Sequence, residues 1–170
     1  IIHVNINGEE ILCKRPLIFK WNDPVKGEQF KNWILAPKVT ANISKKVMIF
    51  SNDRAKKIDI KLKSHSGFQS GKINLKAPNG WQITGSNDYQ LNATDDETTM
   101  TYEIKPLENA SSGNLTVMLN DEKAKAINTI EYDHIPTQRW FPDAELELVN
   151  LDINIPERKI GYLMGAGDLV

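Results

Sequence analysis

Apolar and polar residues alternate with a period of two along much of the chain. The clearest example spans residues 57–63, in which aliphatic and charged residues follow one another. Successive side chains of a strand point to opposite faces of a sheet, so the pattern is typical of antiparallel strands with one buried and one solvated face. Similar runs occur at residues 72–76, 99–104, 114–119 and 145–153.

Turn-forming residues separate these runs. They include Asn7-Gly8 and Pro78-Asn79-Gly80, with further Gly- and Ser-rich breaks at 66–67, 85–88 and 111–114. The strongest helix candidate, residues 121–126, is too short to change the fold class. The pattern therefore predicts an all-β protein, an immunoglobulin-like antiparallel β-sandwich with extra N- and C-terminal strands.

The runs divide the chain into four zones. Residues 1–45 are predicted to hold accessory strands and an aromatic-rich loop, and residues 46–134 the sandwich itself. Residues 135–158 are predicted to form strands that pair with the N-terminal zone. Residues 159–170 combine an apolar run with a Gly-x-Gly loop at 165–167, which predicts the start of a following α/β domain.

Composition excludes several classes of protein. The 170 residues are 40% hydrophobic and 25% charged, as in an ordinary globular protein. A net charge of −1 gives no reason to expect a nucleic acid or an acidic membrane as a partner. No apolar stretch approaches the roughly 20 residues of a membrane helix. The single cysteine, Cys13, follows two aliphatic residues and is predicted to be a buried structural thiol.

No residue pattern predicts catalysis or metal binding. His3, His65 and His134 are scattered, and none belongs to a His-x-x-x-His or Cys-x-x-Cys spacing. The acidic clusters at 95–97 and 121–122 lack the alternating spacing of a calcium loop and are interpreted as solvated turn charges. We therefore predict no catalytic residue, no metal site and no cofactor.

Two clusters of aromatic residues are the best candidates for a binding surface. In one interpretation the rings are buried, where they hold long loops against the sandwich or seal a contact between domains. In the alternative, exposed tryptophans stack on a sugar ring while nearby polar groups meet its hydroxyls. The candidate contact residues are Trp21, Phe30, Trp33, Arg139, Trp140 and Phe141.

Two parts of the sequence resemble a known family. Residues 70–83 are similar to the strand–Pro-x-Gly-Trp–strand core of the NEW3 domain, an immunoglobulin-like module. Pro78-Asn79-Gly80 would make the tight connection, and Trp81 would fold back into the core. Residues 20–28 and 149–168 resemble the region after the catalytic domain of long bacterial PIG-L (LmbE-like) deacetylases.

In that family a zinc-dependent sugar N-deacetylase domain comes first, and a β-sandwich and an α/β domain follow. The resemblance implies a noncatalytic accessory domain that spaces and orients its neighbours in the parent chain. The His-Pro-Asp-Asp zinc motif of the family is missing from this sequence, so no catalytic or metal residue is carried over. The implied partners are the flanking domains, with carbohydrate as the alternative, and analogy suggests a periplasmic or cell-envelope location.

Overall fold

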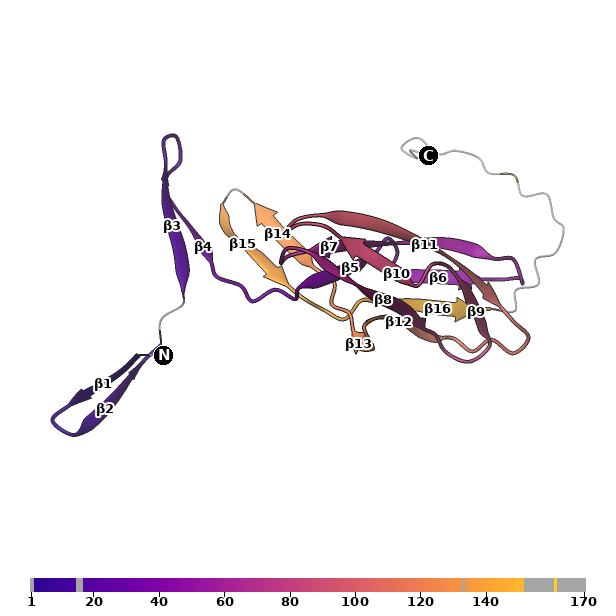
Figure 1. Ribbon diagram of the computed structural model, residues 1–170, viewed down its shortest axis with the longest axis horizontal. Coiled ribbons are helices and arrows are strands. Elements are labelled where there is room, and N and C mark those ends of the chain that lie inside the picture. Colours follow the sequence, from indigo (N-terminus) through magenta and orange to yellow (C-terminus); the bar gives the residue numbers. More distant parts are fainter. Residues whose placement is uncertain (1, 15–16, 133, 152–160, 162–170) are drawn as a thin grey trace.

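Strands and turns account for the described part of the chain, as the alternating pattern predicts. The computed structural model describes residues 2–14, 17–132, 134–151 and 161, and no helix occurs among them. Most of the strands form two sheets that pack face to face as a β-sandwich (Figure 1). The all-β prediction is therefore confirmed.

The larger sheet has the strand order β10-β8-β12-β16-β6, and β13 pairs with β12 outside this path. Its strands are β6 (Val47–Phe50), β8 (Gln69–Lys76), β10 (Asp88–Leu91), β12 (Gly113–Leu119), β13 (Glu122–Lys123) and β16 (Glu145–Asn150). All pairs are antiparallel except that β6 runs parallel to β16.

The smaller sheet is antiparallel, with the order β5-β7-β11-β9. Its strands are β5 (Val39–Ile43), β7 (Lys56–Ser64), β9 (Trp81–Thr84) and β11 (Glu97–Pro106). This order matches the A-B-E-D sheet of immunoglobulin domains, and β8-β12-β16 corresponds to their C-F-G sheet. The topology is therefore immunoglobulin-like.

The core lies between the two sheets and follows the alternation in the sequence. On β7 every second side chain is buried, and the charged residues between them face solvent. Full burial of an aliphatic or aromatic side chain contributes about 1.5–3 kcal/mol each, so these inward faces dominate stability. The largest fully buried side chains are Phe50, Ile58, Ile60, Leu62, Ile73, Leu91, Tyr102, Ile104, Leu115, Val117, Leu146 and Leu148.

Trp81 closes one end of the sandwich. Its ring packs edge-on against Phe50 at 4.9 Å between centroids, and its Nε1–H donates to the Ser111 carbonyl at 2.8 Å. Gly80 before it has φ +84°, and a Cβ there would lie 2.6 Å from Ala110 Cα. Only glycine fits this turn without strain. The expected tight connection and inward-folded tryptophan are confirmed.

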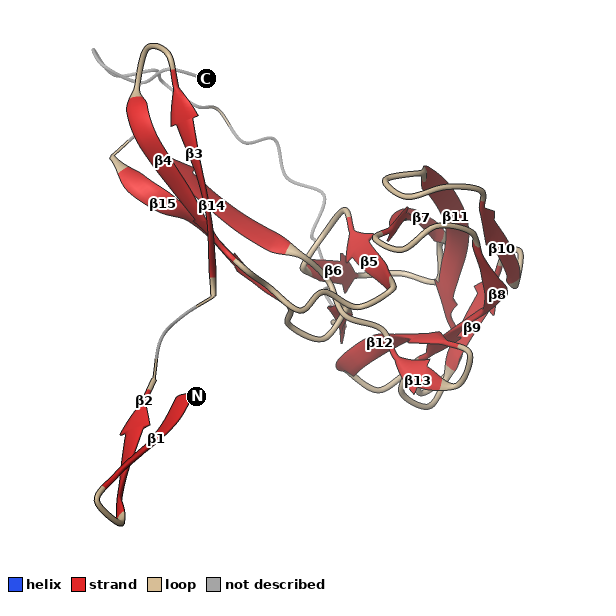
Figure 2. Ribbon diagram, turned by 60° about the vertical axis from the view of Figure 1, so that its left-hand side comes forward, coloured by secondary structure: helices blue, strands red, loops and turns tan. Residues whose placement is uncertain are grey.

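Three two-stranded antiparallel hairpins lie outside the sandwich. They are β1 (Ile2–Ile6) with β2 (Glu9–Cys13), β3 (Ile18–Asp23) with β4 (Gly27–Asn32), and β14 (Asn128–Tyr132) with β15 (Ile135–Trp140). β4 lies against β15, whereas β1–β2 stands apart from the rest in both views (Figures 1 and 2). The predicted Asn7-Gly8 turn joins β1 and β2, with positive φ at both residues as a type I′ turn requires.

Strand pairing differs from the expected zones in several places. β5 belongs to the sandwich, although it falls within residues 1–45. β16 pairs with β12 and β6, so the prediction that residues 135–158 pair with the N-terminal zone is wrong for this strand. The physical reason is that its inward residues Leu146 and Leu148 complete the sandwich core. β14 leaves the sandwich and pairs with β15.

The helix candidate at 121–126 is also wrong. Asn120 and Asp121 have positive φ and form a tight turn, after which β13 returns along β12. The predicted start of an α/β domain at 159–170 lies outside the described residues, apart from Gly161. No helix in the described ranges is long and apolar enough to cross a membrane.

Tyr102 supplies a stability test. Its Oη donates to the Ser86 carbonyl at 2.6 Å, and burial raises its pKa to about 12 from an ordinary 10.0. Tyr102→Phe should lower the free energy of unfolding by about 1 kcal/mol, because the Ser86 carbonyl loses its donor. Urea denaturation near neutral pH measures this change.

Because the pKa of Tyr102 is raised, the free energy of unfolding should depend on pH at alkaline values, and the direction of that dependence is fixed. The stabilisation from neutral Tyr102 is complete below pH 10.0 and falls as the pH rises toward about 12, because the unfolded chain ionises first. Tyr102→Phe should lack this component, whereas Tyr132→Phe, at a ring that is 62% exposed, should keep it. Equal alkaline profiles for the wild type and Tyr102→Phe would contradict the assignment.

Candidate functional site

The hairpins β3–β4 and β14–β15 enclose a cleft of about 380 Å³. Its lining combines aromatic rings with charged and amide side chains, and polar groups make up most of it. The lining residues are Trp21, Asp23, Lys26, Gln29, Phe30, Lys31, Glu131, Tyr132, Ile135, Pro136, Thr137 and Arg139.

Trp21 forms one aromatic wall of the cleft. Phe19 and Trp21 are two residues apart on β3 and therefore share a face, where their rings stack at 5.7 Å with 27° between the planes. Gln29 pairs with Trp21 across the hairpin and lies on the same face. The Phe19 contact restricts the indole, while 41% of Trp21 remains exposed. The result is an oriented, partly open aromatic surface.

Asp23 shapes the tip of the β3–β4 hairpin. Its Oδ1 accepts hydrogen bonds from the backbone N–H groups of Val25 and Lys26, both at 2.8 Å, and Gly27 completes the turn with φ +74°. These two hydrogen bonds favour the carboxylate and lower the pKa of Asp23 from 3.8, Lys26 N–H being the larger cause. The tip is therefore ordered by its own side chain, and Oδ1 is already occupied.

The opposite wall comes from β14–β15. A register shift between Ile130 and Tyr132 marks a β-bulge, which changes the direction of side chains at this point of the strand. Glu131 and Tyr132 line the cleft beside the bulge, and Arg139 lies further along β15. Within the described part of the chain, the Arg139 side chain makes no hydrogen bond or ion pair, and its charge also acts on His65 in the neighbouring cavity.

A second cavity, of about 390 Å³, adjoins Arg139 where the hairpin meets the sandwich. Lys63 in its wall is paired with Asp95 at 3.2 Å and Glu97 at 3.4 Å. His65 is hydrogen-bonded through Nε2 to Thr40 Oγ1 at 3.0 Å, and burial, with Lys63 as the next cause, lowers its pKa. The charges here are largely matched, so this cavity is mainly structural.

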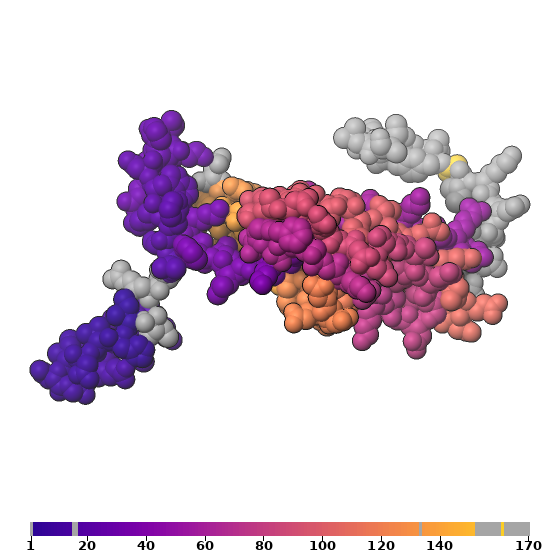
Figure 3. Space-filling view, in the orientation of Figure 1, coloured from indigo at the N-terminus to yellow at the C-terminus, as the bar shows by residue number. Residues whose placement is uncertain are grey.

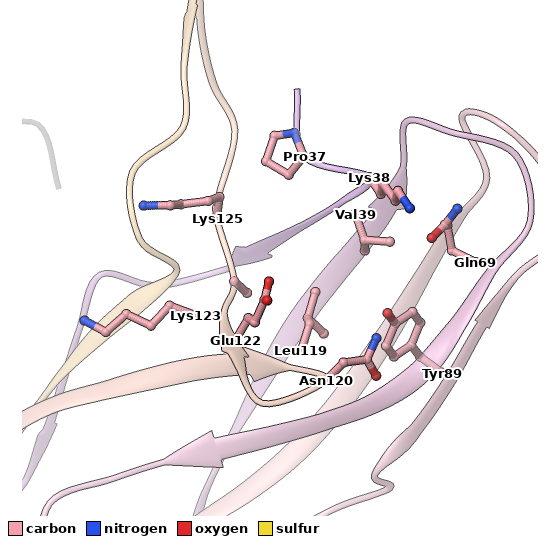
Figure 4. Close-up of a pocket in the computed structure, with 11 residues that line it drawn as sticks. Pro37, Lys38, Val39, Gln69, Tyr89, Leu119, Asn120, Glu122, Lys123 and Lys125 are labelled. Carbon is pink, nitrogen blue, oxygen red and sulfur yellow. The ribbon is translucent and has the colours of Figure 1, made fainter. Parts of the chain in front are cut away.

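A third cavity, of about 420 Å³, opens at the end of the sandwich (Figure 4). Its floor is Val39, Tyr89 and Leu119, which belong to or flank the core. Figure 4 shows Lys123 and Lys125 extending away from Tyr89. Lys125 pairs with Asp143 at 2.5 Å, and Lys123 with Asp143 and Glu145 at 3.5 Å. This cavity therefore concentrates no specific chemistry, and it is an open edge of the core.

The structure unites residues from both predicted aromatic clusters. Trp21, Phe30 and Arg139 line the hairpin cleft, and Phe141 lines the second cavity with Arg139. Trp33 and Trp140 line neither cavity, and their side chains are 69% and 46% exposed. Within the described part of the chain these two rings are therefore not buried, and burial against a neighbouring domain stays a prediction.

Several residues that line the cleft or orient its lining are missing from the sequence-based prediction. Phe19 could have been found from its period-two spacing to Trp21, since both positions share a strand face. Gln29 follows only from the hairpin register. Glu131 and Tyr132 depend on the bulge, which leaves no recognisable signal in the sequence.

The β1–β2 hairpin carries an uncovered apolar face. Its register places Ile2 opposite Cys13 and Val4 opposite Ile11, and Ile6 lies on the same face. All five side chains are exposed. Figure 3 shows the N-terminal hairpin (indigo) as a lobe apart from the sandwich. The prediction of a buried Cys13 is therefore wrong, because no layer of the described residues packs over its apolar neighbours.

The opposite face of this hairpin is mixed: it carries the exposed Leu12, and His3 Nδ1 lies 2.5 Å from Glu10 Oε1. In the described ranges, no group of three or more His, Cys, Asp or Glu side chains is arranged to hold a metal ion. The hairpins therefore offer two distinct surfaces, an aromatic-polar cleft and an apolar face.

Comparison with known proteins adds little to this geometry. No family model matches the sequence, and no curated protein matches it. The solved crystal structure of a FixG-related protein from Vibrio parahaemolyticus is similar over 66% of this chain and 98% of that chain, at 8% identity and a TM-score of 0.42. A similarity this weak carries no argument about function.

The Asp23 turn can be tested by its titration. The amide resonances of Val25 and Lys26 should titrate with a midpoint below pH 3.8, since their hydrogen bonds persist until the Asp23 carboxylate is protonated. The stabilisation of the turn is complete above that pH and is lost as the pH falls through the lowered pKa. Asp23→Asn keeps an acceptor and should remove the titration. A midpoint at or above 3.8 would contradict the assignment.

Proposed function

We propose that this chain is a noncatalytic β-sandwich accessory domain that spaces and orients neighbouring domains of a longer bacterial sugar N-deacetylase-like protein. The observation that carries the proposal is the exposed apolar face of the β1–β2 hairpin. In this proposal the face packs against the catalytic domain that precedes it in the family that the sequence resembles.

Physical chemistry supports a role in which a partner covers this face. An isolated two-stranded hairpin is at best marginally stable in water, because it has no second layer to bury its apolar side chains. Covering Ile2, Val4, Ile6 and Ile11 would contribute roughly 1 kcal/mol or more for each side chain. Contiguous exposed apolar residues are otherwise typical of interaction surfaces.

The identity of the covering partner comes from the sequence resemblance. Residues 20–28 and 149–168 resemble the region that follows the deacetylase domain in the PIG-L family, which places such a domain on the N-terminal side of β1. A tethered domain has a high effective concentration, so a small apolar contact is enough to orient it.

Saccharide binding is a second candidate function, and one observation favours it. Of the three tryptophans considered as sugar platforms, Trp21 alone lines the cleft between the hairpins, together with amide, carboxylate and guanidinium groups. Trp33 and Trp140 lie outside that lining. The two functions use different surfaces and do not exclude one another.

Cys13 is the only cysteine in the sequence and lies on the apolar face, so it reports directly on whether that face is covered. In the chain alone, its thiol should react with a maleimide at the rate of an exposed cysteine. In a longer protein that includes the preceding deacetylase domain, the rate should fall about 10-fold or more, because reaction then requires the contact to open.

Two variants on β1 form a matched pair for this test. Val4→Asp places a charge on the apolar face and should restore fast labelling in the longer protein. Asn5→Asp places the same charge on the opposite face and should leave Cys13 protected. Equal labelling rates with and without the preceding domain would overturn the proposed packing.

A further inference from the structure

We infer that the cleft between β3–β4 and β14–β15 binds an acidic saccharide, a sugar chain containing a uronic acid residue. The inference rests on the second candidate function, saccharide binding, and names the ligand class. Two observations carry it: the cleft is lined by an oriented indole, and also by a guanidinium that makes no hydrogen bond or ion pair with the described residues.

Trp21 supplies the surface for the sugar ring. Its contact with Phe19 restricts the indole before any ligand arrives, so little side-chain freedom is lost on binding. The C–H face of a pyranose can then pack on the exposed part of the indole. Gln29 lies opposite Trp21 on the same face, where its amide can meet ring hydroxyls.

Arg139 is the residue that would select a ligand with negative charge. Its guanidinium has no hydrogen-bond or ion-pair partner in the described ranges, so its fork of donors is available to a ligand. Guanidinium groups bind carboxylates through two parallel hydrogen bonds, which are stronger than neutral ones. A carboxylate on the sugar is therefore the group that this residue would recognise.

The remaining charges leave the cleft suited to an anion. Lys26 and Lys31 add two further cations to the lining. Of the two carboxylates, Asp23 already accepts two backbone hydrogen bonds through Oδ1, which leaves Glu131 as the main acceptor for hydroxyl groups. Three cationic side chains against two carboxylates in the lining favour a ligand with negative charge and several hydroxyls.

The size and lining of the cleft agree with this ligand class. Its volume of about 380 Å³ falls within the range of small-ligand pockets. Most of the lining is polar, which suits a hydroxylated ligand better than an apolar peptide side chain. The cleft is only partly enclosed, so a longer sugar chain can continue beyond it.

The test uses the whole 170-residue chain and two matched probes, trigalacturonic acid and its fully methyl-esterified form. The probes share one sugar chain and differ in whether its carboxyl groups are free and charged or methyl-esterified and neutral. Calorimetry at physiological ionic strength should show the acid binding about 10-fold more tightly than the ester, as expected for one charge-assisted contact.

Three variants assign the contribution of each residue. Arg139→Gln should remove most of the preference for the acid and leave ester binding unchanged. Trp21→Ala should weaken the binding of both probes about 10-fold or more, since the stacking surface is lost. Trp33→Ala removes an exposed ring outside the cleft and should change neither affinity. Amide spectra confirm that each variant keeps its fold.

The outcomes separate the inference from the function on which it rests. Equal affinity for acid and ester, with loss in Trp21→Ala, would leave saccharide binding in place and overturn the acidic specificity. Binding of neither probe would overturn both. Loss of affinity in Trp33→Ala but not in Trp21→Ala would move saccharide binding away from the cleft and overturn the inference.

Discussion

Burial of two apolar sheet faces against each other is the interaction on which the rest of this structure depends. β7 and β11 contribute one inward face, and β12 and β16 contribute the other. Trp81 and Tyr102 pack in or against this core while they donate hydrogen bonds to backbone carbonyls, so their polar atoms are satisfied. The sandwich is thereby a rigid support, and hairpins can project from it without contributing to its core.

The hairpins obey the same alternation but lack a second layer. In β7 an apolar face meets the opposite sheet, whereas in β1–β2 a similar face meets solvent. The same geometry therefore stabilises the fold in one place and leaves a surface available in another. On β3–β4 and β14–β15 the available surface is mixed, with Trp21 near Arg139, and this gives the cleft its chemical character.

The sequence alone predicts which residues share a strand face. It says much less about what covers that face. The run at 57–63 was sufficient to predict β7 and its buried residues. For 145–150 the pattern predicted a strand but the wrong partner, because alternation carries no information about pairing. The prediction that Cys13 is buried was wrong for a similar reason, because alternation does not show what packs over a strand face. Trp21 and Arg139 were both candidates, but only the fold brings them into one cleft, and the bulge near Glu131 could not be predicted.

The central claim is that the sandwich core holds this chain together while the β1–β2 hairpin gains no support from it. Residue-resolved amide hydrogen exchange on the chain alone tests this most directly. We expect β7 and β11 amides to exchange only through global unfolding, and the β1–β2 amides to exchange with opening free energies near zero. Protection of β1–β2 equal to that of β7 would contradict the claim, because the hairpin would then share the stability of the core.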